Sequence, residues 1–166
     1  MMQRYVIMGV SGCGKSTVGA AFAAAIGGQF IDGDDLHPEA NVAKMASGQP
    51  LTDTDRAPWL VKVGQALQAG PGPVVIGCSA LKRRYRDVIR HEAAQPVLFL
   101  HLTGSRAVLL ARMAARTGHF MPPSLLDSQL AALEPPGFDE AAIAVDIDQT
   151  PQAILAELLR KTDQKQ

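Results

Sequence analysis

The chain of 166 residues has little that would tie it to nucleic acid, to a membrane or to an oxidising compartment. Lysine plus arginine equals aspartate plus glutamate at 16 each, so the basic excess of a dedicated nucleic-acid binder is missing. No uninterrupted apolar run reaches the roughly 18 residues that indicate a membrane span. The start also lacks the long apolar segment and cleavage site of a secretory signal. We therefore expect a cytoplasmic protein without nucleic-acid or membrane partners.

Metal-binding and disulfide patterns are missing too. The two cysteines, Cys13 and Cys78, are far apart in the sequence and form no metal-type pair, which is typical of reduced intracellular thiols. His37 and His119 have no partners at metal-ligand spacing, so no zinc site is predicted. The apolar share of 47% is enough for one hydrophobic core, and the length predicts a single domain over residues 1–166.

What the sequence does have is a regular alternation of apolar runs and helix-period segments. The apolar runs predict strands at 4–9, 29–34, 72–80, 96–102 and 141–148. The segments between and after them predict helices at 15–28, 38–47, 54–69, 81–93, 105–117, 125–134 and 150–161. This alternation, with strands rich in Val, Ile and Leu, predicts a three-layer α/β fold: a five-stranded parallel sheet with helices on both faces.

A glycine-rich loop follows the first predicted strand. It matches G-x-x-x-x-G-K-[ST] at every fixed position and leads into a predicted helix, the context that this phosphate-binding motif requires. Glycines let successive backbone N–H groups point at phosphate oxygens, and the helix N-terminus favours an anion. We expect Lys15 to reach the β- and γ-phosphates of ATP, and the Ser16 hydroxyl to bind Mg²⁺. The candidate ATP-binding residues are Gly9, Val10, Ser11, Gly12, Cys13, Gly14, Lys15, Ser16 and Thr17.

This loop alone does not define the reaction, because switch GTPases, motor ATPases and small-molecule kinases share it. The base-selecting N-K-x-D tetrapeptide of a switch GTPase is absent. The best acidic candidates are Asp32 and Asp34, at the end of the second predicted strand. One is expected to orient Mg²⁺ through water, and the other to accept a proton from an attacking hydroxyl. Asp32 is assigned to the metal and Asp34 to the hydroxyl, although the two roles can be exchanged; a solvated Asp-Gly-Asp turn is the structural alternative.

Basic residues supply the remaining candidates. Arg112 and Arg116 are spaced i,i+4 on one predicted helix, just before a segment broken by glycine and proline. We expect residues 117–127 to form a lid, with both arginines closing over the transferring phosphoryl group. A solvated helix face is the alternative. Trp59 is interpreted as a core or capping residue.

Several segments together resemble one family. "DGDDLHP", "KMASGQPLTDTDRAPWL", "CSALKRRYRD" and "ARTGHFMPPSLLDSQLAALEPP" occur, with the glycine-rich loop, in the order found in gluconokinases of the short P-loop type, relatives of shikimate and nucleoside monophosphate kinases. The resemblance covers residues 8–151. Cys13 stands where the family often has serine, and backbone N–H groups carry the phosphate contacts there. The resemblance implies phosphoryl transfer from ATP to the 6-hydroxyl of D-gluconate, and a homodimer.

The resemblance also assigns regions and residues. By analogy with related kinases the strand order is 2-3-1-4-5, and residues 38–69 form a helical region on the substrate side. Gln149 and Pro151 are expected beside the adenine. The candidates for binding the substrate are Asp34, His37, Arg56, Lys82, Arg86 and His119. A kinase for shikimate or another small acceptor, and a non-catalytic nucleotide-binding regulator, remain the alternative functions.

Overall fold

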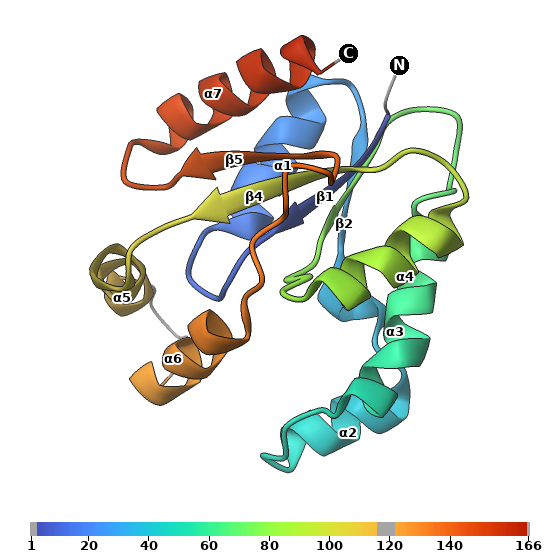
Figure 1. Cartoon of the computed structure of the whole chain (residues 1–166), viewed down its shortest axis with the longest axis vertical. Coiled ribbons are helices and arrows are strands. Elements are labelled where there is room, and N and C mark those ends of the chain that lie inside the picture. The colour runs from blue at the N-terminus through green and yellow to red at the C-terminus, as the bar shows by residue number, and fades with distance from the viewer. Residues whose placement is uncertain (1–2, 116–121, 166) are drawn as a thin grey trace.

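The computed structural model describes residues 3–115 and 122–165, and its centre is a parallel β-sheet (Figure 1). The sheet has five strands in the order β2-β3-β1-β4-β5, as the sequence predicts. Every neighbouring pair is parallel. The strands are β1 (Arg4–Met8), β2 (Gln29–Asp32), β3 (Val74–Gly77), β4 (Leu98–Thr103) and β5 (Ala142–Asp146).

Helices cover both faces of this sheet (Figure 1). The helices α1 (Lys15–Ala25) and α7 (Pro151–Gln164) pack on one face, and α3 (Asp53–Ala66) and α4 (Arg83–Ala93) pack on the other. Because successive strand residues point to opposite faces, the core divides into two clusters. One cluster joins Phe22 and Leu158 to Ile7, and the other joins Leu60 and Ile89 to Val6.

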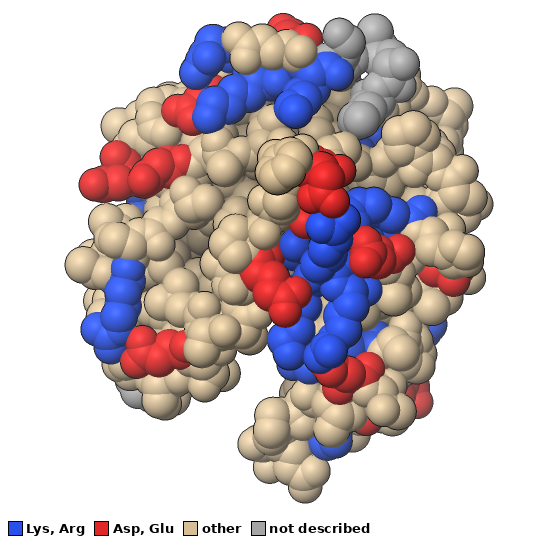
Figure 2. All heavy atoms as spheres, viewed as in Figure 1, with Lys and Arg blue, Asp and Glu red and all other residues tan. Residues whose placement is uncertain are grey.

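The remaining elements gather at the carboxyl ends of the strands. They are the 3₁₀ helix η1 (Gly33–Leu36) and the helices α2 (Glu39–Ala46), α5 (Arg106–Ala115) and α6 (Pro123–Ala132). In the space-filling view the molecule is notched between the lobe carrying α6 and the lobe carrying α2 (Figures 1 and 2). Open α/β sheets bind their ligands at this end of the strands, so we expect the functional site there.

The ends of several elements differ from the sequence prediction. The predicted helix 15–28 ends at Ala25, because Gly27 adopts a left-handed conformation with φ of 71°. The predicted strand 72–80 is confined to β3, since the chain turns toward α4 at Ala80, whose φ is 47°. Of the predicted lid 117–127, residues 117–121 lie outside the described residues, and the first part of α6 occupies 123–127. Residues 38–69 contain α2 and α3.

Candidate active site

The phosphate loop connects β1 to α1 and fits closely against neighbouring elements. Gly9, Gly12 and Gly14 have φ values of 146°, 87° and 93°, which side chains rarely permit. A Cβ atom on Gly9 would lie 2.7 Å from the carbonyl oxygen of Leu102, and one on Gly12 would lie 2.7 Å from Cγ of Met113. The end of β4 and the helix α5 therefore pack closely on the loop, and a side chain at Gly9 or Gly12 would require these neighbours to move.

Lys15 begins α1, and its side chain folds back over the loop. Its Nζ donates hydrogen bonds to the carbonyl oxygens of Gly9, at 2.9 Å, and Val10, at 3.2 Å. This places a positive charge over the first residues of the loop. Cys13 is buried beneath the loop, and this burial raises the pKa of its thiol.

The two acids predicted from the sequence lie where β2 ends. Asp32 pairs with Gly77 of β3, and its Oδ1 accepts a hydrogen bond of 3.0 Å from the backbone N–H of Asp34. Gly33 between them is buried, and it packs so closely on β3 that a Cβ atom there would lie 2.3 Å from the carbonyl oxygen of Gly77. The indole N–H of Trp59 donates to the Gly33 carbonyl at 2.7 Å. Trp59 is a buried residue, as predicted, and it fixes the turn that carries both acids.

The electrostatic surroundings of Asp34 suit a proton acceptor. Neighbouring protein atoms partly desolvate its exposed carboxylate and raise its pKa, and the charge of Asp32 raises it further. The charges of His37 and Lys15 act in the opposite direction, which places both groups within electrostatic reach. The His37 ring stacks on Trp59 with centroids 4.1 Å apart, and burial lowers the pKa of His37. Asp34 is therefore within electrostatic reach of the phosphate-loop lysine and of His37, whose lowered pKa favours the neutral ring at neutral pH.

A basic cluster surrounds Tyr85 on α4. The charged groups of Arg56, Lys82 and Arg84 lie 5.5, 5.9 and 5.7 Å from the centre of the Tyr85 ring. Asp53 accepts hydrogen bonds from the Tyr85 hydroxyl and from Arg84. Three positive charges against one carboxylate leave an excess that suits an anionic substrate. Arg56 and Lys82 are predicted substrate-binding residues, whereas the part played here by Tyr85 and Asp53 was not predicted.

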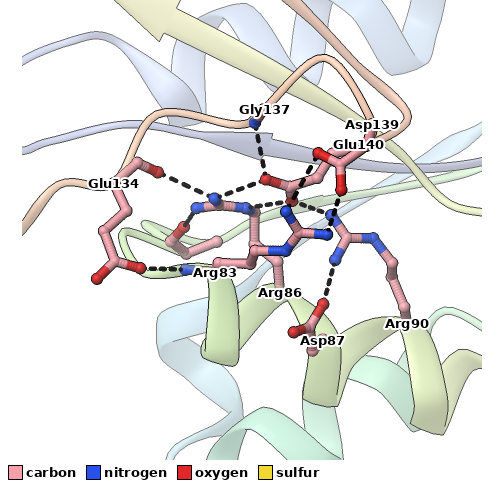
Figure 3. A network of polar contacts seen from close by, with 9 residues as sticks. Arg83, Arg86, Asp87, Arg90, Glu134, Gly137, Asp139 and Glu140 are labelled. Carbon is pink, nitrogen blue, oxygen red and sulfur yellow. Dashed lines mark hydrogen bonds and ion pairs between the residues drawn. The ribbon is translucent and has the colours of Figure 1, made fainter.

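Arg86 was predicted to bind the substrate, and the structure contradicts this prediction. It is fully buried, and its guanidinium bonds Glu140 at 2.8 and 3.0 Å, and the carbonyl oxygens of Ala80 and Glu134, each at 2.9 Å (Figure 3). These bonds hold the pKa of Glu140 at about 2, with the Arg86 hydrogen bond as the main cause. A guanidinium whose donors are used inside the protein cannot contact gluconate. Arg86 instead joins α4 to the segment before β5.

Replacing Arg86 with alanine is expected to lower the free energy of unfolding by about 3–5 kcal/mol, because the buried Glu140 carboxylate loses its fully buried partner and keeps only Arg90 and the Gly137 N–H. The control is Arg83→Ala. Arg83 pairs with Asp139 at 2.7 Å on the exposed side of the same network (Figure 3), and such pairs contribute about 0–1 kcal/mol. Urea denaturation of both variants measures the difference. Equal losses would contradict the structural role of Arg86.

The other predicted arginines have different outcomes. The guanidinium of Arg112 donates to the carbonyl oxygens of Ile147 and Gln149, the latter at 3.0 Å. Within residues 3–115 and 122–165 it makes no hydrogen bond to the phosphate loop, and the phosphoryl clamp stays a prediction. Its guanidinium instead contacts the loop after β5, where the adenine is predicted to bind. Arg116 and His119 lie outside the described residues.

The donor set at the ends of β1 and β2 fits Mg²⁺. Ser16 offers an exposed hydroxyl at the start of α1, and Asp32 offers a carboxylate whose Oδ2 has no hydrogen-bond partner among the described residues. Mg²⁺ prefers such oxygen ligands and takes only one or two from the protein, completing its shell with phosphates and water. No cluster of three or more His, Cys, Asp or Glu side chains suited to a metal occurs in the described part of the chain.

Gln129 is a residue near the phosphate loop that the sequence analysis missed. Its Oε1 accepts a hydrogen bond of 2.7 Å from the backbone N–H of Ser11. It lies on α6, 118 residues after the loop residue that it contacts. A lone glutamine in an amphipathic helix carries no signal that could have predicted this contact.

A glycine-rich phosphate loop at the end of β1, with two acids at the end of β2 of a 2-3-1-4-5 sheet, defines the P-loop kinase class of phosphoryl-transfer enzymes. A family model described as "AAA domain" matches residues 5–136. The gluconokinase of Gluconobacter oxydans (strain 621H) is 50% identical over 159 residues, which cover 93% of this chain and 88% of that protein. The thermosensitive gluconokinase of Escherichia coli (strain K12) is 45% identical, covering 93% and 88%. The chain belongs to the gluconokinase family.

Solved structures agree with this assignment. The crystal structure of a gluconokinase from Sinorhizobium meliloti 1021 is 50% identical, with a TM-score of 0.84, and the match covers 96% of this chain and 94% of that one. A shikimate kinase from Aquifex aeolicus vf5 has a TM-score of 0.61 at 15% identity, with 96% of both chains covered, and shows the shared fold alone. In the described part of the chain no helix is long and apolar enough to cross a membrane.

Proposed function

We propose that the protein transfers the γ-phosphoryl group of ATP to the 6-hydroxyl of D-gluconate, giving 6-phospho-D-gluconate and ADP. Gluconokinases at 50% and 45% identity over 93% of the chain support the donor and the acceptor. The observation that carries the proposal is the position of Asp34. It lies within electrostatic reach of Lys15 on the donor side and of His37, next to the basic cluster around Tyr85, on the acceptor side.

Phosphoryl transfer leaves little covalent chemistry to the protein, which positions the reacting oxygens in line and stabilises charge. Backbone N–H groups of the phosphate loop bind the phosphate oxygens, and Lys15 exchanges its carbonyl partners for the β- and γ-phosphates. Asp34 accepts the proton of the attacking hydroxyl. Its raised pKa makes it a better acceptor than an ordinary aspartate.

The acceptor is held on the side of α3 and α4. Arg56 and Lys82 pair with the gluconate carboxylate, and His37 donates or accepts hydrogen bonds with its hydroxyls. The positive excess around Tyr85 supports this orientation of gluconate. The opposite end of the gluconate molecule, which carries the 6-hydroxyl, then points toward Asp34. Arg112, Gln149 and Pro151 form the adenine side.

Ser16 and Asp32 would hold Mg²⁺, directly or through water. A bound Mg²⁺ neutralises charge on the β- and γ-phosphates and orients them. In the closed complex we assign the phosphoryl clamp to Arg116, and a substrate contact to His119.

Release of ADP, followed with and without D-gluconate, tests the proposed function. We expect ADP to form only when ATP, Mg²⁺ and gluconate are all present, and a panel of polyhydroxy acids with shikimate to show a preference for gluconate. Faster turnover of shikimate or another acid would identify a different acceptor. Tight ATP binding without acceptor-dependent ADP formation would identify a nucleotide-binding regulator.

We also propose that the protein is a homodimer in the cytoplasm. Phe138 is fully exposed beside a largely apolar cavity of about 630 Å³ lined in part by Leu130 and Leu133, and a symmetric contact between copies would bury this surface. Both cysteines are free thiols, which fits a reducing compartment. Light scattering of the purified chain gives the oligomeric state, and a monomer would contradict the first part of the proposal.

A further inference from the structure

The side chain of Gln129 joins α6 to the donor side of the site. Its Oε1 accepts the hydrogen bond of 2.7 Å from the Ser11 N–H, and Ser11 is the third residue of the phosphate loop. The two loop residues before Ser11 supply the carbonyl oxygens that bind Lys15. Because this lysine reaches the β- and γ-phosphates in such loops, the contact lies at the end of the loop where the transferred group is held.

The other end of α6 is joined to the acceptor side. Just after the helix, the backbone N–H of Glu134 donates to the Leu81 carbonyl at 2.7 Å, and Oε1 of Glu134 accepts from the backbone N–H of Arg83 at 2.9 Å. Lys82, which belongs to the basic cluster around Tyr85, lies between these two residues. One continuous segment, 129–134, therefore contacts the phosphate loop at one end and the start of α4 at the other.

The other contacts of α6 are apolar packing in the core and an exposed ion pair with α5. Leu126 is buried in the core, and Leu130 and Leu133 pack against the same cluster. Arg106 and Asp127 form an exposed ion pair at 2.7 Å. Apolar packing is non-directional and allows small sliding movements, whereas a short hydrogen bond to a backbone N–H fixes both distance and direction. Gln129 thus makes a directional hydrogen bond between α6 and the phosphate loop.

We propose that Gln129 is a positioning residue that keeps the donor loop and the acceptor side of α4 in register for transfer. The proposal rests on the kinase function proposed above. A carboxamide suits this place because it accepts the Ser11 N–H bond without adding negative charge beside the triphosphate. Losing the bond leaves each substrate site intact but shifts one relative to the other. A misplacement of about 1 Å can cost up to about 10²-fold in rate.

The test compares Gln129→Met and Gln129→Asn with Gln65→Met, the same substitution at an exposed glutamine of α3 whose side chain makes no hydrogen bond within the described ranges. Methionine removes the acceptor oxygen, and asparagine is one methylene too short to reach Ser11. We expect kcat to fall about tenfold in both Gln129 variants, with KM for either substrate and Kd for ADP within about twofold of the control. This split separates lost register from a lost binding site.

Hydrogen–deuterium exchange at the Ser11 amide gives a readout that needs no activity. We expect faster exchange in both Gln129 variants and no change in Gln65→Met. Unchanged exchange, a kcat equal to that of the control, or a loss of kcat that only follows a lower melting temperature would overturn the proposal. The wild-type chain is assayed beside the variants. If it forms no gluconate-dependent ADP, the proposed function fails by itself, and the exchange data still test the contact.

Discussion

Lys15→Ala is expected to lower kcat by about 10²–10³-fold, because one preorganised positive charge at the transferring phosphoryl group is lost. The fold should stay intact, since Lys15 bonds only loop carbonyl oxygens, at 2.9 and 3.2 Å, and a sulfur atom, and water can replace it there. Coupled ADP release at saturating ATP and gluconate measures kcat. Circular dichroism and urea denaturation check the fold.

The matched control for this prediction is Lys62→Ala, which removes an exposed lysine of α3 with no ion pair or hydrogen bond among the described residues. It is expected to behave as the wild type. Near-normal kcat in Lys15→Ala would remove Lys15 from the mechanism. A loss of activity that follows loss of the folded protein would make its role structural.

Asp34→Asn is expected to lower kcat by about 10²–10⁴-fold, the usual contribution of a positioned proton acceptor, with much less effect on ATP affinity. Asp35→Asn changes the neighbouring exposed acid and is the control. Wild-type activity should rise with pH as Asp34 loses its proton, with a midpoint above the ordinary aspartate pKa of about 3.8, because desolvation and Asp32 raise the pKa of Asp34. This acid limb should disappear in Asp34→Asn.

Equal losses of kcat and ATP affinity in Asp34→Asn would instead assign Asp34 to Mg²⁺. Asp32→Asn then becomes the decisive variant. With the roles as proposed, it raises the Mg²⁺ concentration needed for half-maximal activity. With the roles exchanged, it lowers kcat at every Mg²⁺ concentration.

The parts of the molecule that the sequence predicts well are those whose causes are local. The residues of the phosphate loop are adjacent in the sequence, and its glycines adopt the positive φ angles that the loop requires. The strand order follows from the family resemblance. Asp32 and Asp34 are placed by the end of one strand, and Trp59 by its apolar character.

The failures concern side chains whose partners are distant in the sequence. Arg86 and Lys82 belong to the same basic stretch of sequence, so their roles cannot be told apart there. Only the fold brings Glu140, 54 residues later, to the Arg86 guanidinium. Arg112 was assigned to the phosphoryl group from its i,i+4 spacing with Arg116. Its hydrogen bonds to the carbonyl oxygens of Ile147 and Gln149 could not be predicted, because these residues follow β5, far along the chain. Tyr85 and Asp53 approach each other across α3 and α4 for the same reason. No periodic pattern in the sequence predicts these pairings.

The packing of Trp59 gives the chain an intrinsic optical reporter. It is the only tryptophan, its indole N–H is held by the Gly33 carbonyl between the two acids, and its ring stacks on His37 at the proposed acceptor site. Indole emission depends on the polarity and charge of its immediate surroundings, so the whole tryptophan signal of this chain arises at one corner of the site. Binding at this part of the site can therefore be followed in the unlabelled protein.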